Sequence, residues 1–236
     1  MHREYLKWFS PALHRDMELL VFGHSGAPLL VFPTSKGRFF EYEDRGMIAA
    51  NAPLYEAGHL QAFCVDSVDA ESWYNRDTHP ANRVLRHIQY ENYLLNEVLP
   101  LIAHRSGGQR LTAMGCSFGG YHAANFSFRH PHLVARCISM SGAFDIRSFL
   151  RGHYDQNAYF HNPVDFLPQL SDHTSLSQLR DMQIILGTSD WDICLPDNLR
   201  LAGILQDKAI PHWLDIWRDN SKHDWPLWQR MVRNYF

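Results

Sequence analysis

The stretch RLTAMGCSFGGYHAANF, residues 110–126, contains the pattern that decides the fold. Its first part is a short apolar run that predicts a β-strand, and the part after the glycines predicts an α-helix. The pattern G-x-S-x-G joins the two, with Ser117 at its centre. In such a turn the serine takes a positive φ that exposes its hydroxyl, and Gly115 and Gly119 leave room where a Cβ atom would meet backbone. We therefore predict that Ser117 is a nucleophile at the carboxyl end of a strand.

A helix that begins directly after Ser117 brings free backbone N–H groups to the same place. These groups stabilise the oxyanion that forms when a serine attacks a carbonyl carbon. We expect the N–H of Phe118 to be one donor. The second donor is expected from the loop after an earlier strand, where LLVFPTSKGRF (residues 29–39) offers Thr34 or Ser35, and we favour Ser35.

A serine hydroxyl needs an imidazole to take its proton and a carboxylate to orient that imidazole. His223 lies in a polar turn between the last predicted strand and the last predicted helix, where such a base is expected. Asp190 ends the run at residues 182–190, and Asp192 follows it. We favour Asp190 because it is nearer the strand end. Asp145, after the preceding strand, is a further alternative. The order serine, acid, histidine along the chain agrees with this chemistry.

Strands and helices alternate along most of the chain, which predicts a three-layer α/β sandwich around a mostly parallel, twisted sheet. Two apolar runs at 17–23 and 28–32, separated by HSGA, predict an antiparallel hairpin near the N-terminus. Residues 41–58 predict one helix, and residues 80–104 predict the longest helix, bent at Pro100.

The alternation stops at residues 143–180, which are rich in aromatic residues, Asp, Asn, Pro and Ser. We interpret this segment as a small lid-like insertion over the active site. The chain has 236 residues, a length that α/β folds often reach as one unit, so we expect a single domain over residues 1–236.

Composition excludes several classes of protein. The chain has 22 Lys and Arg against 25 Asp and Glu, a net charge of -3, and no basic run, so nucleic-acid binding is not expected. It has no apolar run of roughly 18 residues and no signal-peptide pattern, so we expect no membrane association and a cytoplasmic location. No residue pattern calls for a metal or a cofactor. The four cysteines are widely spaced, and we expect free thiols at Cys64, Cys116, Cys137 and Cys194.

Several segments together make the chain resemble a known family, the esterase D and antigen 85 group of esterases within the α/β-hydrolase superfamily. The resemblance spans nearly the whole chain. It rests on SWYNR (72–76), YENYLLNEVLPLI (90–102), GCSFGGYHA (115–123), MSGAFD (140–145), GTSDWD (187–192) and KHDWPLW (222–228).

The resemblance implies a serine carboxylesterase that forms an acyl-enzyme, with Ser117 as nucleophile, Asp190 as acid, His223 as base and Phe118 as an oxyanion donor. It implies a small-molecule ester substrate and no cofactor. Family members act on diverse esters, and some transfer acyl groups, so an acyltransferase remains an alternative, as does a non-catalytic binding protein on the same fold. One departure is the loop FPTSKGRF, which lacks the more usual glycine-containing form. The oligomeric state is left open.

Overall fold

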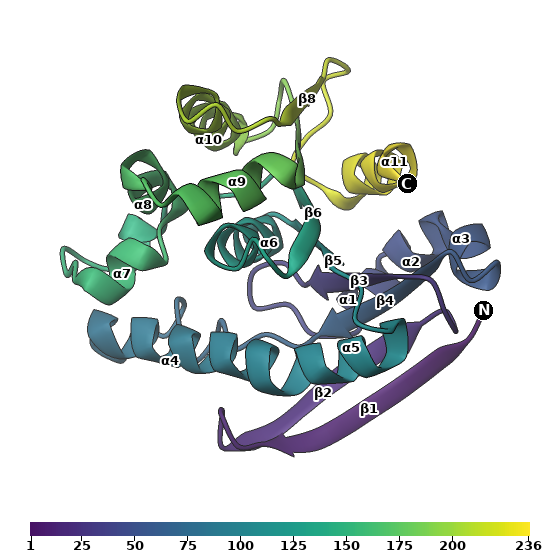
Figure 1. Cartoon of the computed structure of the whole chain (residues 1–236). Coiled ribbons are helices and arrows are strands. Elements are labelled where there is room, and N and C mark those ends of the chain that lie inside the picture. The colour runs from purple at the N-terminus through teal and green to yellow at the C-terminus, as the bar shows by residue number, and fades with distance from the viewer.

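The central strand, β5 (Leu111–Cys116), is buried along its whole length, as a parallel strand covered on both faces must be. The computed structural model describes all 236 residues, and its one sheet has eight strands. Strands β3 to β8 pair in parallel, which confirms the predicted α/β fold (Figure 1). The order across the sheet is β1 (Arg3–Ser10), β2 (Arg15–Phe22), β4 (Leu60–Val65), β3 (Ala27–Phe32), β5, β6 (Val134–Met140), β7 (Gln183–Ser189) and β8 (Trp213–Trp217).

The prediction that the first two apolar runs pair with each other as a hairpin is wrong. The runs at 17–23 and 28–32 do form β2 and β3, but β4 lies between these strands in the sheet. Strand β2 pairs instead in antiparallel register with β1, which is not among the predicted elements. Strand β3 is buried and takes parallel partners on both sides, which a hairpin with β2 would prevent. In β1, Leu6 and Trp8 pack against the core, so an alternating pattern was present.

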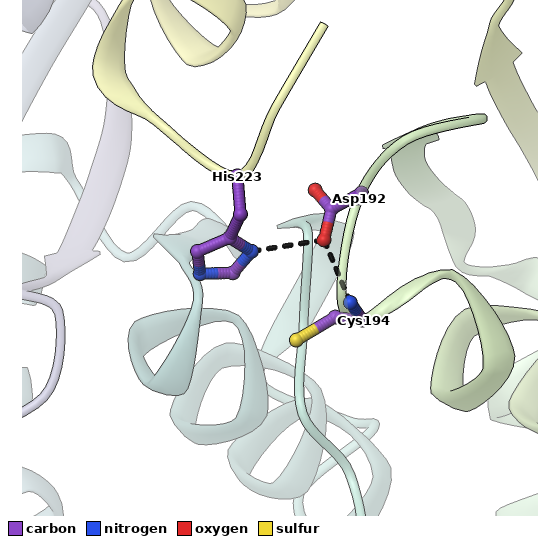
Figure 2. A group of neighbouring side chains, drawn as sticks. All are labelled: Asp192, Cys194 and His223. Atoms are coloured by element: carbon purple, nitrogen blue, oxygen red, sulfur yellow. Dashed lines mark hydrogen bonds and ion pairs between the residues drawn. The ribbon is translucent and has the colours of Figure 1, made fainter. Parts of the chain in front are cut away.

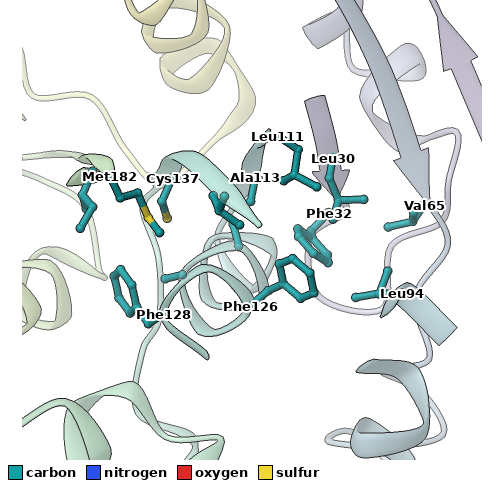
Figure 3. Close-up of a cluster of buried hydrophobic side chains, with 14 of the residues drawn as sticks. Leu30, Phe32, Val65, Leu94, Leu111, Ala113, Phe126, Phe128, Cys137 and Met182 are labelled. Atoms are coloured by element: carbon teal, nitrogen blue, oxygen red, sulfur yellow. The ribbon is translucent and has the colours of Figure 1, made fainter. Parts of the chain in front are cut away.

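Helices cover both faces of the sheet and complete the three predicted layers (Figure 1). On one face Phe126 points toward Phe32 and Leu94 (Figure 3), and burial of each such side chain contributes about 1.5–3 kcal/mol. The second face is covered by α1 (Glu41–Asp44), α2 (Met47–Ala50), α3 (Ala52–Glu56) and α11 (Trp225–Tyr235). The face that contains Phe126 is covered by α4 (Pro80–Tyr93), α5 (Leu99–Ser106), α6 (Phe118–Arg129), α8 (Pro163–Gln169), α9 (His173–Asp181) and α10 (Leu195–Asp207).

Two predicted helices differ from the structure in detail. Residues 41–58 form three short helices rather than one, because Gly46 takes a left-handed φ of 70° between the first two. Residues 80–104 form α4 and α5, joined by the π-helical turn η1 (Leu94–Val98). Pro100 therefore lies in the first turn of α5, directly after this π-helical turn.

Residues 143–180 form η2 (Ile146–Phe149), α7 (Gln156–Phe160), α8 and most of α9. Helix α8 packs against α10 and α6, so this part of the segment is joined to the main helical layer. All four cysteines are buried and unpaired, as predicted. No helix combines the length and the apolar character needed to cross a lipid bilayer.

Candidate active site

Ser117 lies in the sharp turn between β5 and α6, with φ 55° and ψ -122°. The positive φ confirms the predicted turn geometry, and the neighbouring glycines explain how the turn fits. A Cβ atom on Gly115 would lie 2.1 Å from the carbonyl oxygen of Gly119, and one on Gly119 would lie 2.5 Å from the carbonyl oxygen of Pro33. Any other residue at these positions would collide with backbone. The turn therefore presents the hydroxyl at the carboxyl edge of the sheet.

His223 meets this hydroxyl from the turn between β8 and α11. Its Nε2 atom lies 2.9 Å from the Oγ atom of Ser117, and its ring packs edge-on against Trp228 with centroids 5.0 Å apart. The Nδ1 atom lies 2.9 Å from Oδ1 of Asp192. Because a carboxylate accepts the Nδ1–H bond, the Nε2 lone pair is free to accept the serine proton.

The structure places Asp192, which the sequence left as an alternative, beside His223 in place of the favoured Asp190. Asp190 donates its backbone N–H to the carbonyl of Trp217 at 3.1 Å, and so continues the ladder with β8. Its carboxylate accepts the backbone N–H of Asn220 at 3.1 Å and supports the turn before the histidine. The N–H of Asp192 donates to the carbonyl of Ser189 at 3.2 Å, and this turn brings the Asp192 carboxylate to the imidazole (Figure 2).

Asp145, the other alternative acid, is held elsewhere. Its carboxylate accepts hydrogen bonds from the guanidinium groups of Arg147 at 2.6 Å and Arg200 at 2.8 Å. It therefore forms part of an ion-pair cluster beside η2, and no hydrogen bond joins it to His223.

The Asp192 carboxylate is buried and strongly hydrogen-bonded. It accepts bonds from His223, from the backbone N–H of Cys194 at 2.8 Å, and from the hydroxyl of Ser141. Burial alone would raise its pKa, but these hydrogen bonds outweigh burial and hold the pKa below its ordinary value. The carboxylate is thus ionised at neutral pH. The indole N–H of Trp228 donates to Ser141 at 2.8 Å and extends the network.

Sequence reasoning did not identify Ser141 or Trp228 as parts of this network. Both lie inside segments that carry the family resemblance, MSGAFD and KHDWPLW, so the resemblance pointed to these segments but not to the two residues. Their contact with each other and with Asp192 depends on β6, β7 and α11 coming together, which no local pattern encodes.

The two expected oxyanion donors lie on segments that pack together. Phe118 is the first residue of α6, and the carbonyls of Phe32 and Pro33 abut Gly119 in the same turn. Of the two loop candidates, Thr34 already donates its N–H to Glu41 at 2.8 Å, whereas the N–H of Ser35 makes no hydrogen bond. The free N–H favours Ser35, the residue that the sequence analysis preferred.

Asp192, Cys194 and His223 each offer one possible metal-ligand atom, and these atoms lie within 4.8 Å of one another (Figure 2). Burial, with the charges of Asp192 and Asp197 adding to it, raises the pKa of the Cys194 thiol to about 12, so the thiol is protonated at neutral pH. The imidazole and the carboxylate already bind each other, and the imidazole also binds Ser117. We therefore interpret the group as acid–base machinery.

Aromatic rings pack against Phe118, the residue after Ser117. The ring of Phe118 lies 5.5 Å from that of Tyr74 and 5.2 Å from that of Phe149. Beside the acid, Trp191 is 60% exposed and Ile193 is 79% exposed, so both are open to a ligand.

Comparisons with known proteins identify a family and a fold. Residues 61–232 match the model of a family described as "Putative esterase". Solved structures of similar fold include a ferulic acid esterase, with 17% identity, a TM-score of 0.79 and coverage of 99% of this chain and 95% of that one. No match is found among curated protein sequences.

Two further structures share the fold. S-formylglutathione hydrolase FrmB from Staphylococcus aureus has 16% identity and a TM-score of 0.74, with coverage of 99% of this chain and 95% of that one. MPT51 (FbpC1) from Mycobacterium tuberculosis has 15% identity and a TM-score of 0.73, with coverage of 99% and 96%.

Proposed function

The chain belongs to this esterase family, and from that premise we propose that Ser117, His223 and Asp192 hydrolyse a carboxylic ester through an acyl-enzyme. The observation that carries the proposal is the unbroken line of hydrogen bonds between the three side chains. Serine and imidazole are joined at 2.9 Å, and imidazole and carboxylate are joined at 2.9 Å. This arrangement lets a neutral imidazole remove the serine proton while the carboxylate stabilises the imidazolium that forms.

The first half of the proposed reaction forms the acyl-enzyme. The Oγ atom of Ser117 attacks the ester carbonyl carbon as its proton moves to Nε2 of His223. The carbonyl oxygen becomes an oxyanion, which the N–H groups of Phe118 and Ser35 stabilise. When this intermediate collapses, the bond to the leaving oxygen breaks and Nε2 returns the proton to the departing alcohol.

The second half releases the acid. A water molecule attacks the acyl carbon and gives its proton to Nε2, and the same N–H groups stabilise the second oxyanion. Collapse of this intermediate breaks the bond to Oγ, and the proton on Nε2 returns to Ser117. The imidazole thus acts as base and then as acid in each half.

A small-molecule ester with an apolar or aromatic substituent is the substrate class that we propose. Tyr74 and Phe149 support it, because their rings pack around Phe118 beside the nucleophile. Among proteins of this fold, one is named a ferulic acid esterase, which agrees with an aromatic acyl group. We retain as proposals the single domain over residues 1–236, with 143–180 as a lid-like insertion, and the cytoplasmic location.

Covalent labelling tests the proposal directly. A fluorophosphonate should react with the protein once and leave its adduct on Ser117. Ser117→Ala should abolish labelling and lower kcat for p-nitrophenyl acetate about 10⁶-fold, because the triad acts as a unit. Ser127→Ala is the matched control: this buried hydroxyl lies on the same helix, bonded to the carbonyl of Ala123, and its loss should leave labelling intact. Turnover that survives in Ser117→Ala would refute the assignment.

A further inference from the structure

Asp69, in the loop after β4, joins two segments that are far apart in the sequence. Its Oδ1 atom lies 2.9 Å from Nε2 of His122 on α6, and its Oδ2 atom accepts the backbone N–H of Lys36 at 3.1 Å. One of these segments begins at Phe118 and the other contains Ser35, so they carry the two proposed oxyanion donors. We propose that Asp69, together with His122, is a positioning residue that holds the two halves of the oxyanion hole in register. This inference rests on the proposed function.

The loop side of the bridge has a conformation that its sequence does not favour. Lys36 takes φ 57°, in the left-handed region that favours glycine, and Gly37 donates its N–H to the carbonyl of Thr34 at 2.9 Å. The φ of Ser35 is not positive, so the positive φ at the third residue and this hydrogen bond define a type II turn over residues 34–37. In a type I turn the peptide between Ser35 and Lys36 is flipped, and the N–H of Lys36 would point away from Asp69. The bond to Asp69 therefore selects the type II turn.

The contacts on either side of Ser35 explain how this turn aims the free N–H. Glu41 binds the N–H of Thr34 at 2.8 Å and its hydroxyl at 2.8 Å, which fixes the preceding peptide. Asp69 fixes the following peptide through Lys36, and the hydroxyl of Tyr74 donates to the Oγ atom of Ser35 at 2.7 Å. The N–H of Ser35 lies between these anchors without a partner of its own, as an oxyanion donor must.

The helix side of the bridge is buried and closely packed. His122 lies one helical turn after Phe118, and the two rings meet edge-on with centroids 5.0 Å apart. The side chains of His122 and Asp69 are 2% and 1% exposed. A buried carboxylate is costly unless it is paired, and here both oxygens are paired with the segments that must be aligned. Oxyanion stabilisation needs that alignment, because a 1 Å misplacement can lower the rate about 10²-fold.

Kinetics of Asp69 variants test the bridge. Asp69→Ala should lower kcat for p-nitrophenyl acetate about 10- to 100-fold with little change in KM, because the donors act mainly in the transition state. Affinity for a phenylboronic acid, which forms a tetrahedral adduct with a serine, should fall by a similar factor. Asp69→Asn keeps an acceptor for Lys36 and should restore most of kcat.

Glu91→Ala is the matched control. Glu91 and His130 form a partly buried carboxylate–imidazole pair at 2.9 Å, but at the opposite end of α6 from Phe118. Its loss should lower the free energy of unfolding and leave kcat within a few-fold. If Glu91→Ala lowers kcat as much as Asp69→Ala, or if Asp69→Ala leaves kcat and boronate affinity unchanged, the positioning role is wrong.

Position 36 gives a second test that leaves the buried pair untouched. Lys36 is exposed, and a β-branched residue strongly avoids a positive φ, so Lys36→Val should lower kcat about tenfold more than Lys36→Gly. Lys36→Gly should also recover part of the activity lost in Asp69→Ala. Equal kcat in the valine and glycine variants would overturn the inference. Fluorophosphonate labelling of Ser117 in the wild-type protein decides the proposed function separately, because it does not depend on the bridge.

Discussion

Two aspartate–imidazole pairs in this molecule have the same separation, 2.9 Å, and opposite settings. Asp192 binds the Nδ1 atom of His223, which leaves Nε2 for the serine, and this imidazole side chain is 17% exposed. Asp69 binds the Nε2 atom of His122, whose side chain is 2% exposed. An aspartate–imidazole pair alone therefore does not identify a base. On our proposals, the two roles differ because the carboxylates bind different ring nitrogens and because only His223 is accessible to solvent.

Removal of each imidazole should have the largest effects and should separate the two pairs most clearly. His223→Ala should lower kcat about 10⁶-fold, because it removes the proposed base. It should cost less stability than the loss of His122, because Ser141 and the backbone N–H of Cys194 still donate to Asp192. His122→Ala should lower kcat by no more than about 100-fold. It should cost about 3–5 kcal/mol of stability, because it leaves a buried carboxylate without its partner. Steady-state kinetics and urea unfolding measure both effects. Similar kinetic losses in the two variants would mean that the pairs do not differ in role.

Exchange of the acid's carboxylate for an amide should have the next largest effect. Asp192→Asn should lower kcat about 10⁴-fold, because the imidazole is then held in the wrong tautomer. Asp190→Asn keeps an acceptor for the backbone N–H of Asn220 and should change kcat only a few-fold. The two residues lie in the same loop, so each variant controls for the other. A larger loss in Asp190→Asn would return the role of acid to Asp190.

The pH dependence of stability should show the smallest effect. The folded pKa of Asp192 lies below its ordinary value, so the carboxylate stabilises the fold above about pH 4. This contribution is lost as the pH falls through the folded pKa. Asp192→Asn should therefore be less stable than wild type by about 1–3 kcal/mol at pH 7. The difference should narrow at pH 3.

Urea unfolding at a series of pH values measures this difference. Ser117→Ala, which removes no titratable carboxyl, should follow the wild-type curve in parallel. If the difference in free energy of unfolding between wild type and Asp192→Asn stays constant down to pH 3, the charge of the carboxylate does not stabilise the fold.

Local patterns were enough for most of the fold. The apolar runs and glycines that predict strand, turn and helix around Ser117 do form β5 and α6, and the alternation of elements gives the parallel sheet. Strand partners were not predictable in the same way. The neighbour of β2 depends on where β4 enters the sheet, and that is settled by burial of β3 on both sides rather than by the short connection between residues 23 and 27.

The site divides in a similar manner. Ser117 and His223 occupy positions that local sequence marks, at a strand-to-helix turn and in a polar turn before the last helix. Asp190 and Asp192 were indistinguishable by composition, because the choice depends on a backbone bond from Asp190 to Trp217 in another strand. Asp69 carries no motif, and its importance appears only when the loop at Lys36 and α6 are seen together.

The left-handed Lys36 has a consequence for engineering. Its backbone is constrained through its N–H, so the exposed side chain contributes little to the shape of the turn. Its amine lies 5.4 Å from the centre of the Tyr74 ring, which borders the reacting serine through Phe118. Unbranched side chains of different size or charge can therefore be introduced at position 36 to vary the surface beside Tyr74 while the turn keeps its shape.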